Sequence, residues 1–370
     1  MPQGIRVDAI HGTICDLTGE KFGYFGWPSV ARTESGRMYA IASGLRWGHV
    51  CPWGKTVLFT SEDSGATWSR PRVINDTPLD DRDAGIISLG GEKVLLTWFT
   101  SDTKNIANVE NAPEEIRDEW RNAIDAIPDS VREKWRGSWV RTSVDGEAWS
   151  DFIRAPVNTP HGPIRLESGD LLYFGKQWWM PGMGDPMEHV GDMRAAISRD
   201  DGYTWEELGS VPLPPETSPK NLHEPHVVET ASGRLIAMIR YQHSGDAKAY
   251  ESFSLLQSES DDGGKTWTEA HHTGVYGSPP HMIRHSSGAI VCVYGYRREP
   301  FGQRAMISRD DGQTWQSNHI IRDDGPGSDL GYPGSVELPD GRIYTVYYQK
   351  PAKDVKNCAL MFSIWRLPEA

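Results

Sequence analysis

One short phrase recurs along this chain and limits the folds it can adopt. It reads SEDSGATW at 61–68, SRDDGYTW at 198–205, SDDGGKTW at 260–267 and SRDDGQTW at 308–315, with a shorter copy, SVDGEAW, at 143–149. Each copy stands between two strand-like runs, which is the pattern of a β-hairpin. Asp and Ser side chains can cap backbone amides in such a turn, Gly supplies a positive φ, and Trp covers the turn against the sheet. We interpret the phrase as a structural fastener rather than catalytic machinery.

A second pattern, a strand, a glycine turn and another strand, recurs before most of these phrases. Its six copies lie at 28–43, 84–99, 162–176, 225–241, 280–296 and 333–348. Multi-strand repeats of about 40–55 residues are typical of β-propellers. We therefore predict an all-β fold, a single six-bladed β-propeller over residues 1–370. The last blade lacks the fastener, so we expect 358–367 to be its final strand and 7–14 to add the outer strand that closes the ring.

Residues 104–137 interrupt the repeat. The segment carries helix-capping signals and alternating charges, which predict helices. We therefore expect a short helical insertion in the second blade. Its role stays open among a surface decoration, a lid over the site and a contact surface in a homo-oligomer.

The composition argues against several classes of partner and cofactor. Acidic residues outnumber basic ones by 51 to 38, giving a net charge of −13, which disfavours nucleic acid and anionic membranes. No apolar run is long enough for a transmembrane helix. The four cysteines form no CxxC pair, so we predict no zinc knuckle, metal or cofactor. Because the first residues lack a signal-peptide pattern, we expect a cytoplasmic location with reduced thiols.

The fasteners and the six repeats resemble the Asp boxes, or BNR repeats, of the sialidase (neuraminidase) superfamily. The resemblance covers the chain apart from the insertion. It implies an active site at the centre of the ring, on the loops and first strands of the blades. In that family three arginines hold the substrate carboxylate, a glutamate activates a tyrosine nucleophile, and an aspartate serves as the acid/base.

Part of the family's residue set is matched here. The glutamate corresponds to Glu224 in LHEP, the tyrosine to Tyr332 in DLGYPG, and the second arginine to Arg240 in IAMIRY. The third arginine corresponds to Arg298 in YGYRREPFG, with Arg297 as its competitor. The resemblance thus implies a retained tyrosine–glutamate pair with two substrate-binding arginines.

Two members of the family's set are absent. The phrase that holds the first arginine reads Phe25-Gly26-Trp27-Pro28 here, and His49 stands where the aspartate is expected, with Arg46 close by. The resemblance therefore implies a sialidase-like protein that is not a true sialidase. We place Arg46 and Trp27 among the candidate substrate-binding residues.

Three candidate groups could move protons. An unperturbed histidine such as His49 has a pKa of about 6.5, which suits proton transfer near neutrality. Tyr332 is a poor nucleophile alone and needs a base such as Glu224 within hydrogen-bond reach. Asp83, in the DDRDAG phrase before the second blade, is positioned to replace the missing acid.

Several histidines begin blades, where loops converge on the centre of a propeller. We predict that His161, His223 and His281 line the substrate site. A metal held by these histidines or Glu224 is an alternative to the metal-free site. However, His223 and His226 are three apart in an extended segment and should face opposite ways.

Three functions fit these residues. The first is an exo-acting glycoside hydrolase on a terminal, anionic sugar, with His49 or Asp83 as the acid and Tyr332 with Glu224 as the nucleophile pair. The second is a lyase that performs β-elimination on a uronic acid, which the change of aspartate to histidine favours. The third is a non-catalytic glycan-binding propeller. All three imply a small carbohydrate as the partner.

Overall fold

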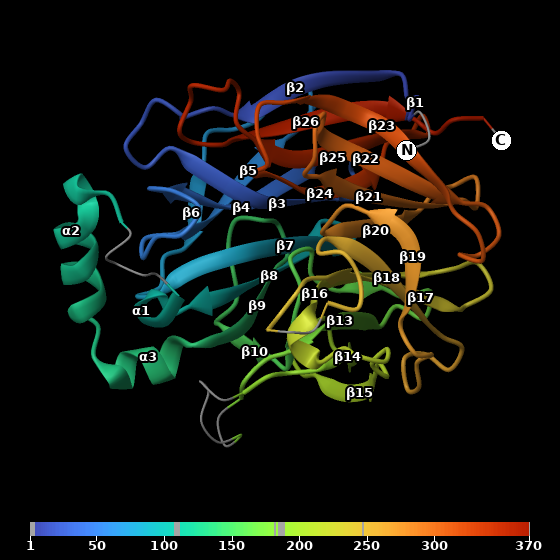
Figure 1. Ribbon diagram of the computed structural model, residues 1–370, viewed down its shortest axis with the longest axis horizontal. Helices are drawn as coiled ribbons and strands as arrows, with labels where there is room; N and C mark the ends of the chain where they lie inside the picture. The colour runs from blue at the N-terminus through green and yellow to red at the C-terminus, as the bar shows by residue number, and fades with distance from the viewer. Residues whose placement is uncertain (1–3, 107–111, 181–182, 184–188, 246–247, 370) are drawn as a thin grey trace.

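The described part of the chain forms six β-sheets, antiparallel apart from one two-residue parallel pairing, and a small helical insertion. The computed structural model describes residues 4–106, 112–180, 183, 189–245 and 248–369. In each sheet the strands follow one another from the inside outward, and the sheets succeed one another along the chain. The all-β, six-bladed propeller predicted from the repeats is therefore confirmed (Figure 1).

Each blade begins at its inner strand. Blades 1 and 2 contain β3 (Tyr24–Arg32), β4 (Met38–Arg46), β5 (Lys55–Ser61), β6 (Arg72–Asn75), β7 (Asp80–Gly90), β8 (Lys93–Ser101), β9 (Gly137–Ser143) and β10 (Ile153–Ala155). Blades 3 and 4 contain β11 (Val157–Asn158), β12 (Ile164–Arg165), β13 (Leu171–Gln177), β14 (Met193–Ser198), β15 (Glu206–Ser210), β16 (Leu222–Glu229), β17 (Leu235–Tyr241), β18 (Ser254–Ser260) and β19 (His271–Tyr276), with a 3-10 turn at Pro219–Asn221 before β16. Blades 5 and 6 contain β20 (Pro280–Arg284), β21 (Ile290–Tyr296), β22 (Phe301–Ser308), β23 (Gln316–Gly325), β24 (Leu330–Glu337), β25 (Arg342–Gln349) and β26 (Ala359–Arg366).

The N-terminal segment closes the ring. Strand β2 (Ala9–Cys15) pairs antiparallel with β26, the last strand of blade 6, so the predicted closing strand is confirmed. The sequence did not indicate β1 (Ile5–Arg6), which adds a parallel fifth strand to blade 5 beside β23. In Figure 1 both strands lie among the last strands of the chain.

The repeated phrase is the fastener that its residues suggest. In the first copy the Ser61 hydroxyl accepts from the Gly65 amide over 2.9 Å, and the Asp63 carboxylate accepts from the Thr67 amide and hydroxyl over 2.9 and 2.6 Å. These bonds hold the pKa of Asp63 at about 2. The turn follows the third strand of its blade, so it lies at the opposite end of the blade from the start of the inner strand.

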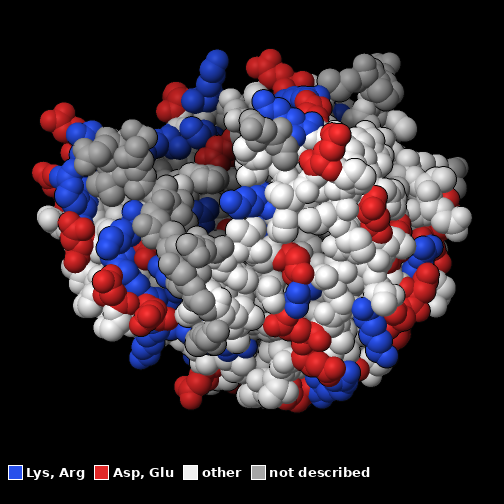
Figure 2. Space-filling model, turned by 60° about the horizontal axis from the view of Figure 1, so that its bottom comes forward, with Lys and Arg blue, Asp and Glu red and all other residues white. Residues whose placement is uncertain are grey.

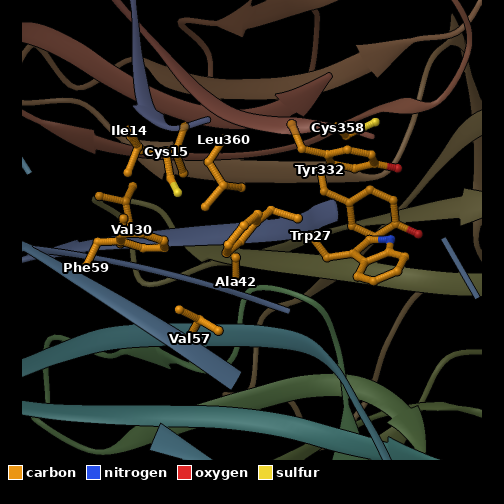
Figure 3. Packing of buried hydrophobic residues seen from close by; sticks show 14 of the residues in the cluster. Ile14, Cys15, Trp27, Val30, Ala42, Val57, Phe59, Tyr332, Cys358 and Leu360 are labelled. Atoms are coloured by element: carbon orange, nitrogen blue, oxygen red, sulfur yellow. The ribbon is translucent and has the colours of Figure 1, made fainter. Parts of the chain in front are cut away.

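The hydrophobic core fills the gaps between neighbouring blades. The largest cluster joins blades 6 and 1 and includes Val30, Phe59, Tyr332 and Leu360. Figure 3 shows the aliphatic members together, with Trp27 and Tyr332 side by side at one end of the cluster. The four cysteines are buried and free. Within the described residues no helix is long and apolar enough to cross a membrane.

The insertion in blade 2 is helical, as predicted. Helices α1 (Thr103–Ile106), α2 (Glu114–Asp125) and α3 (Asp129–Trp135) lie between β8 and β9, and α2 and α3 stand at one side of the strands (Figure 1). Helix α2 buries an apolar side that includes Trp120, which packs against Cys51 and against Trp47 and Trp53. The insertion from blade 2 therefore packs on the β4–β5 loop of blade 1, which carries His49.

Candidate active site

Four inner strands share an unusual backbone feature at equivalent positions. Trp27, Asp83, Glu224 and Tyr332 have φ values of 53°, 49°, 43° and 51°, and each sits at a register shift in its strand pair. Left-handed backbone is rare for such side chains and costs energy, and β-bulges re-aim a side chain. The contacts below show that these four residues meet near the axis of the ring.

Glu224, Arg240 and Tyr332 form one hydrogen-bonded group. The Tyr332 hydroxyl donates to Glu224 Oε1 over 2.6 Å. Arg240 donates from Nη1 to Glu224 Oε2 and lies 3.3 Å from the Tyr332 oxygen, while its Nη2 donates to Gln242 over 2.6 Å. The structure thus brings together the three residues that the sequence predicted to work together.

The protonation states in this group follow from its surroundings. Burial disfavours the Glu224 carboxylate, but the Arg240 charge and the Tyr332 hydroxyl outweigh it and lower the pKa of Glu224. Burial, reinforced by the Glu224 charge, raises the pKa of Tyr332 well above its ordinary value. At rest the pair is a phenol beside a carboxylate, so Glu224 is placed to accept the phenol proton.

The two consecutive arginines after β21 go to different places. Arg297 Nη1 donates to the Ser328 carbonyl over 2.8 Å, and its Cζ lies 5.9 Å from the Tyr332 ring centroid. Arg298 pairs with Glu251 and lies over the Tyr276 ring, 3.7 Å from its centroid. The preference for Arg298 was therefore wrong in placement, and its competitor Arg297 is the arginine beside Tyr332.

His49 forms a dyad with a residue that sequence reasoning missed. Its Nδ1 lies 3.0 Å from Asp329 Oδ1, and because a carboxylate only accepts, Nδ1 carries the proton and Nε2 keeps a lone pair. Asp329 also accepts from Tyr24 and Tyr348 over 3.1 and 3.2 Å. Burial lowers the pKa of His49 although Asp329 opposes it, so the imidazole is neutral, with its side chain 45% exposed. The only sequence signal for Asp329 was its place three residues before Tyr332.

Arg46 supports the His49 loop instead of facing substrate, which corrects its expected role. Its side chain is fully buried and donates to both oxygens of Asp80 over 2.5 and 2.9 Å. It also donates to the carbonyls of Gly48 and His49 over 3.2 and 3.1 Å. Gly54 is required beside this pair, since a Cβ there would overlap both the guanidinium and the carboxylate.

Trp27, the other candidate substrate-binding residue of this region, likewise does not face the substrate. It is 1% exposed, and its ring packs edge-on against Tyr332 at 6.2 Å and against His49 at 5.0 Å. Two guanidiniums lie over it, with the Cζ of Arg82 at 4.2 Å and that of Arg46 at 4.8 Å from the ring centroid. The expectation failed because the bulge in β3 turns the indole into the protein.

Asp83 and its neighbour Arg82 lie beside this group, and in the described part of the chain each has one buried polar atom without a hydrogen-bond partner. Asp83 is 6% exposed, and its buried Oδ1 has no hydrogen-bond partner among the described residues. Burial raises the pKa of Asp83 to about 7, with Arg82 lowering it and Glu224 raising it further. Arg82, which the sequence reasoning did not single out, comes no closer than 4.0 Å to the Asp83 carboxylate.

Three buried histidines form a separate cluster on the axis. The ring centroids of His161, His226 and His281 lie 4.3–5.8 Å apart. They line a cavity of about 230 Å³ together with Ser335, Ile86 and Arg32. Burial lowers the pKa of all three. His161 and His281 therefore belong to this axial cavity and not to the catalytic group.

The cluster does not have the chemistry of a metal centre. Nδ1 of His226 accepts from the Met282 amide, and Nδ1 of His281 from the Ser335 amide. The Nε2 atoms must then carry the proton and lack a lone pair for a metal. Among the described residues no group of three or more His, Cys, Asp and Glu has the geometry to hold a metal ion.

His223 lies apart from His226, beside another missed residue, Lys176. Burial, followed by the Lys176 charge, lowers the pKa of His223 to about 4, while Glu224 opposes the shift. Burial lowers the pKa of Lys176 to about 8, with Glu224 raising it. Lys176 donates to the carbonyls of Pro219 and Leu222 over 3.0 Å each, which fixes the loop that leads into Glu224.

Comparisons with known proteins place this architecture among its relatives. Residues 126–345, more than half of the chain, match the sequence profile of the BNR repeat-like domain. A search of curated proteins finds no match.

Solved structures with a similar fold cover almost the whole chain. A protein of unknown function from Dyadobacter fermentans has 21% identity and a TM-score of 0.73, covering 100% of both chains. The Hadza microbial sialidase Hz136 has 16% identity and a TM-score of 0.66, covering 97% of this chain and 68% of its own. The Trypanosoma rangeli sialidase in complex with sialic acid has 16% identity and a TM-score of 0.64. The alignment covers 97% of this chain and 59% of the sialidase chain. At these identities the likenesses show the propeller fold.

Proposed function

We propose that the central site of this chain is the active site of a carbohydrate-active enzyme, since the chain belongs to the BNR repeat-like family of sialidase-type propellers. The reaction is the hydrolysis of a terminal, anionic sugar from the end of a glycan. One observation carries this proposal, the 2.6 Å hydrogen bond from the Tyr332 hydroxyl to Glu224 Oε1 with Arg240 on the other oxygen. A nucleophile with its base and an orienting third group is the arrangement of covalent catalysis.

The proposed hydrolysis has two steps, and the protonation states of Tyr332, Glu224 and Asp83 determine which group gives and which takes each proton. Tyr332 Oη attacks the anomeric carbon, the bond from that carbon to the leaving oxygen breaks, and Glu224 Oε1 takes the phenol proton. The leaving oxygen takes a proton from Asp83, whose pKa of about 7 keeps it partly protonated near neutrality. Water then attacks the glycosyl–tyrosine intermediate, giving its proton to Asp83, and Glu224 returns the proton to the phenolate.

Basic groups near the centre support an anionic sugar. Arg240, Arg297 and Lys176 all lie close to Glu224 or Tyr332, in a chain whose net charge is −13. Figure 2 shows a face that is hollowed near its centre, with basic side chains visible in the hollow. A local positive field inside an acidic protein attracts an anionic ligand to that place.

The His49–Asp329 dyad favours a second candidate, a lyase. Asp329 holds Nδ1–H, and the neutral His49 ring is partly exposed, so Nε2 is available as a base. In this reaction His49 removes the proton from the carbon next to the carboxylate of a uronic acid, and the bond to the leaving oxygen breaks with formation of a carbon–carbon double bond. The leaving oxygen takes a proton from Tyr332 or Asp83.

A panel of terminal sialosides, uronosides and neutral glycosides tests both reactions. New reducing ends without ultraviolet absorbance, lost in Tyr332→Phe and Asp83→Asn, are expected for the hydrolase. Ultraviolet absorbance from an unsaturated product, lost in His49→Ala, would identify the lyase. Full activity in all three variants would contradict the assignment of the site, and sugar binding without any turnover would point to a glycan-binding propeller.

A further inference from the structure

We propose that Arg82 binds the carboxylate of the substrate, and that the sugar therefore carries a carboxylate rather than being neutral. The inference rests on the proposed function, because it assigns a substrate class to that site. In this chain Gly26 stands where the resemblance to sialidases would place the first arginine. Arg82 reaches the site from the neighbouring blade, on β7.

The hydrogen-bonding state of Arg82 is the first observation. Its side chain is 12% exposed, and its nearest carboxylate oxygens are Asp80 Oδ2 at 3.8 Å and Asp83 Oδ1 at 4.0 Å. Both distances exceed a hydrogen bond, and Nε is fully buried without a partner among the described residues. A buried guanidinium with unmade hydrogen bonds costs free energy, which a bound anion would recover.

Arg46 lies over the same tryptophan ring as Arg82, so the hydrogen bonds of the two arginines can be compared directly. Both guanidiniums lie over the Trp27 ring, yet Arg46 holds both oxygens of Asp80 at hydrogen-bond distance. The acid that could have neutralised Arg82 is thus committed to Arg46. Within the part of the chain that the structure describes, Arg46 is held by hydrogen bonds to Asp80, whereas the buried Nε of Arg82 has no acceptor.

The position of Arg82 relative to the reacting groups is the third observation. It directly precedes Asp83, and its charge lowers the pKa values of both Asp83 and His49. Trp27, beneath its guanidinium, packs against Tyr332, which also has Arg297 near its ring. An anion bound by Arg82 would therefore lie among the groups that move protons and beside the nucleophile.

The chemistry of the side chain selects the ligand. A guanidinium offers a planar fork of N–H donors that matches a carboxylate in bidentate fashion, which an ammonium group cannot reproduce. A neutral sugar would bring no charge to pair with the guanidinium, whose nearest carboxylates, those of Asp80 and Asp83, lie beyond hydrogen-bond distance. We therefore expect acids such as ulosonic and uronic sugars to be bound and their esters to be bound weakly.

Binding measurements on Arg82→Gln and Arg82→Lys test this assignment. The probes are N-acetylneuraminate and D-glucuronate, each compared with its methyl ester by calorimetry. The wild type should bind at least one acid more tightly than its ester. Arg82→Gln should bind that acid at least tenfold more weakly while ester binding changes little, and Arg82→Lys should recover only part of the loss. Arg199→Gln, which removes an exposed ion pair with Glu206, is the control and should match the wild type.

Thermal unfolding separates a ligand role from a structural one. Arg82 makes no hydrogen bond within the described residues, whereas Arg46 holds both oxygens of Asp80. Arg82→Gln should therefore lower the melting temperature much less than Arg46→Gln. A fall in Arg82→Gln comparable to that in Arg46→Gln would overturn the proposal, and so would an unchanged preference for acid over ester.

The experiments distinguish a failure of the Arg82 assignment from a failure of the proposed enzymatic function. An enzyme that cleaves only neutral glycosides and shows no preference for the acids would retain the activity and overturn the role of Arg82. A wild type that prefers the acid through Arg82 without turning over any glycoside would support the binding assignment while contradicting the enzyme. Absence of binding to either acid also overturns the assignment.

Discussion

The hydroxyl of Tyr332 donates to Oε1 of Glu224 over 2.6 Å, joining the inner strands of blades 6 and 4. Both residues have left-handed backbone, at φ values of 51° and 43°. Such strain persists where the surrounding fold imposes it, and it is concentrated at functional sites. The two bulges are therefore the structural device that presents the pair to the centre of the ring.

Removing the phenol oxygen should abolish turnover with little effect on folding. We expect Tyr332→Phe to reduce kcat by at least about a thousandfold, because the nucleophile is lost. Loss of one hydrogen bond should cost about 1 kcal/mol of stability. Turnover on the cleaved glycoside and urea unfolding measure the two effects.

Tyr39→Phe is the matched control for that variant. Tyr39 is fully buried and donates to the Asp145 carbonyl over 3.0 Å, next to a fastener turn. It should lose a similar amount of stability and keep full activity. Equal activity losses in the two tyrosine variants would mean that Tyr332 acts only through packing.

Two buried aspartates with similar pKa values should respond in opposite ways to amidation. Burial raises the pKa of both Asp81 and Asp83 to about 7. Asp81 accepts from Thr77 N and Oγ1 over 2.8 Å each and from Trp98 Nε1 over 3.0 Å. Asp83 Oδ1, by contrast, has no hydrogen-bond partner in the described ranges. We expect Asp83→Asn to stabilise the protein and Asp81→Asn to destabilise it at pH 8.

The sign of the pH dependence follows from the raised pKa of Asp83. A carboxyl whose folded pKa lies above its ordinary value of 3.8 favours the folded state fully below about pH 4 and loses that contribution as the pH rises to about 7. The melting temperature of Asp83→Asn relative to wild type should therefore grow between pH 4 and 7 and then level off. A constant difference across this range would contradict the raised pKa.

The blades could be predicted from the sequence because each repeat is stabilised by contacts among residues that are close together in the chain. The fastener turn is recognised by side chains that hydrogen-bond its own backbone. The strand pairs are recognised by two strand-like runs around a glycine turn. Neither pattern requires knowledge of the tertiary contacts. The closing strand was also predictable, since blade 6 needed an outer partner. The parallel pairing of β1 with β23 was not, because two residues carry too little pattern to indicate a strand.

The site was predictable where a motif named the residue and not where tertiary contacts decided its role. Glu224 and Tyr332 sit in recognisable phrases and do meet. By contrast, Arg297 and Arg298 are adjacent in sequence, and only the surrounding blades determine which one lies beside Tyr332. Asp329 and Arg82 stand within the DLGYPG and DDRDAG phrases, but nothing in those phrases gave either residue a role. Only the folded chain showed them at the centre.

The insertion should influence the reaction through the His49 loop. Trp120 of α2 is 5% exposed and packs against Trp47 and Trp53, which flank His49. Truncating a buried tryptophan costs about 3 kcal/mol locally, so Trp120→Ala should make the insertion more sensitive to proteolysis. If the reaction is the lyase, in which His49 is the base, the same variant should lower kcat about tenfold. Asn122→Ala, at an exposed position on the same helix, should change neither. Unaltered activity in Trp120→Ala would mean that the loop holds His49 without the helix, through Arg46 alone.

The axial histidines should be indifferent to metal ions. His226 and His281 each accept a backbone N–H at Nδ1 over 3.1 and 3.3 Å, which places the ring proton on Nε2. Binding a metal there would require breaking those bonds and reversing both tautomers. We expect the melting temperature and activity to be the same after treatment with a chelator or with added Zn²⁺. A rise in melting temperature with Zn²⁺ that disappears in His226→Gln would show that the cluster binds metal and that the two backbone hydrogen bonds give way to it.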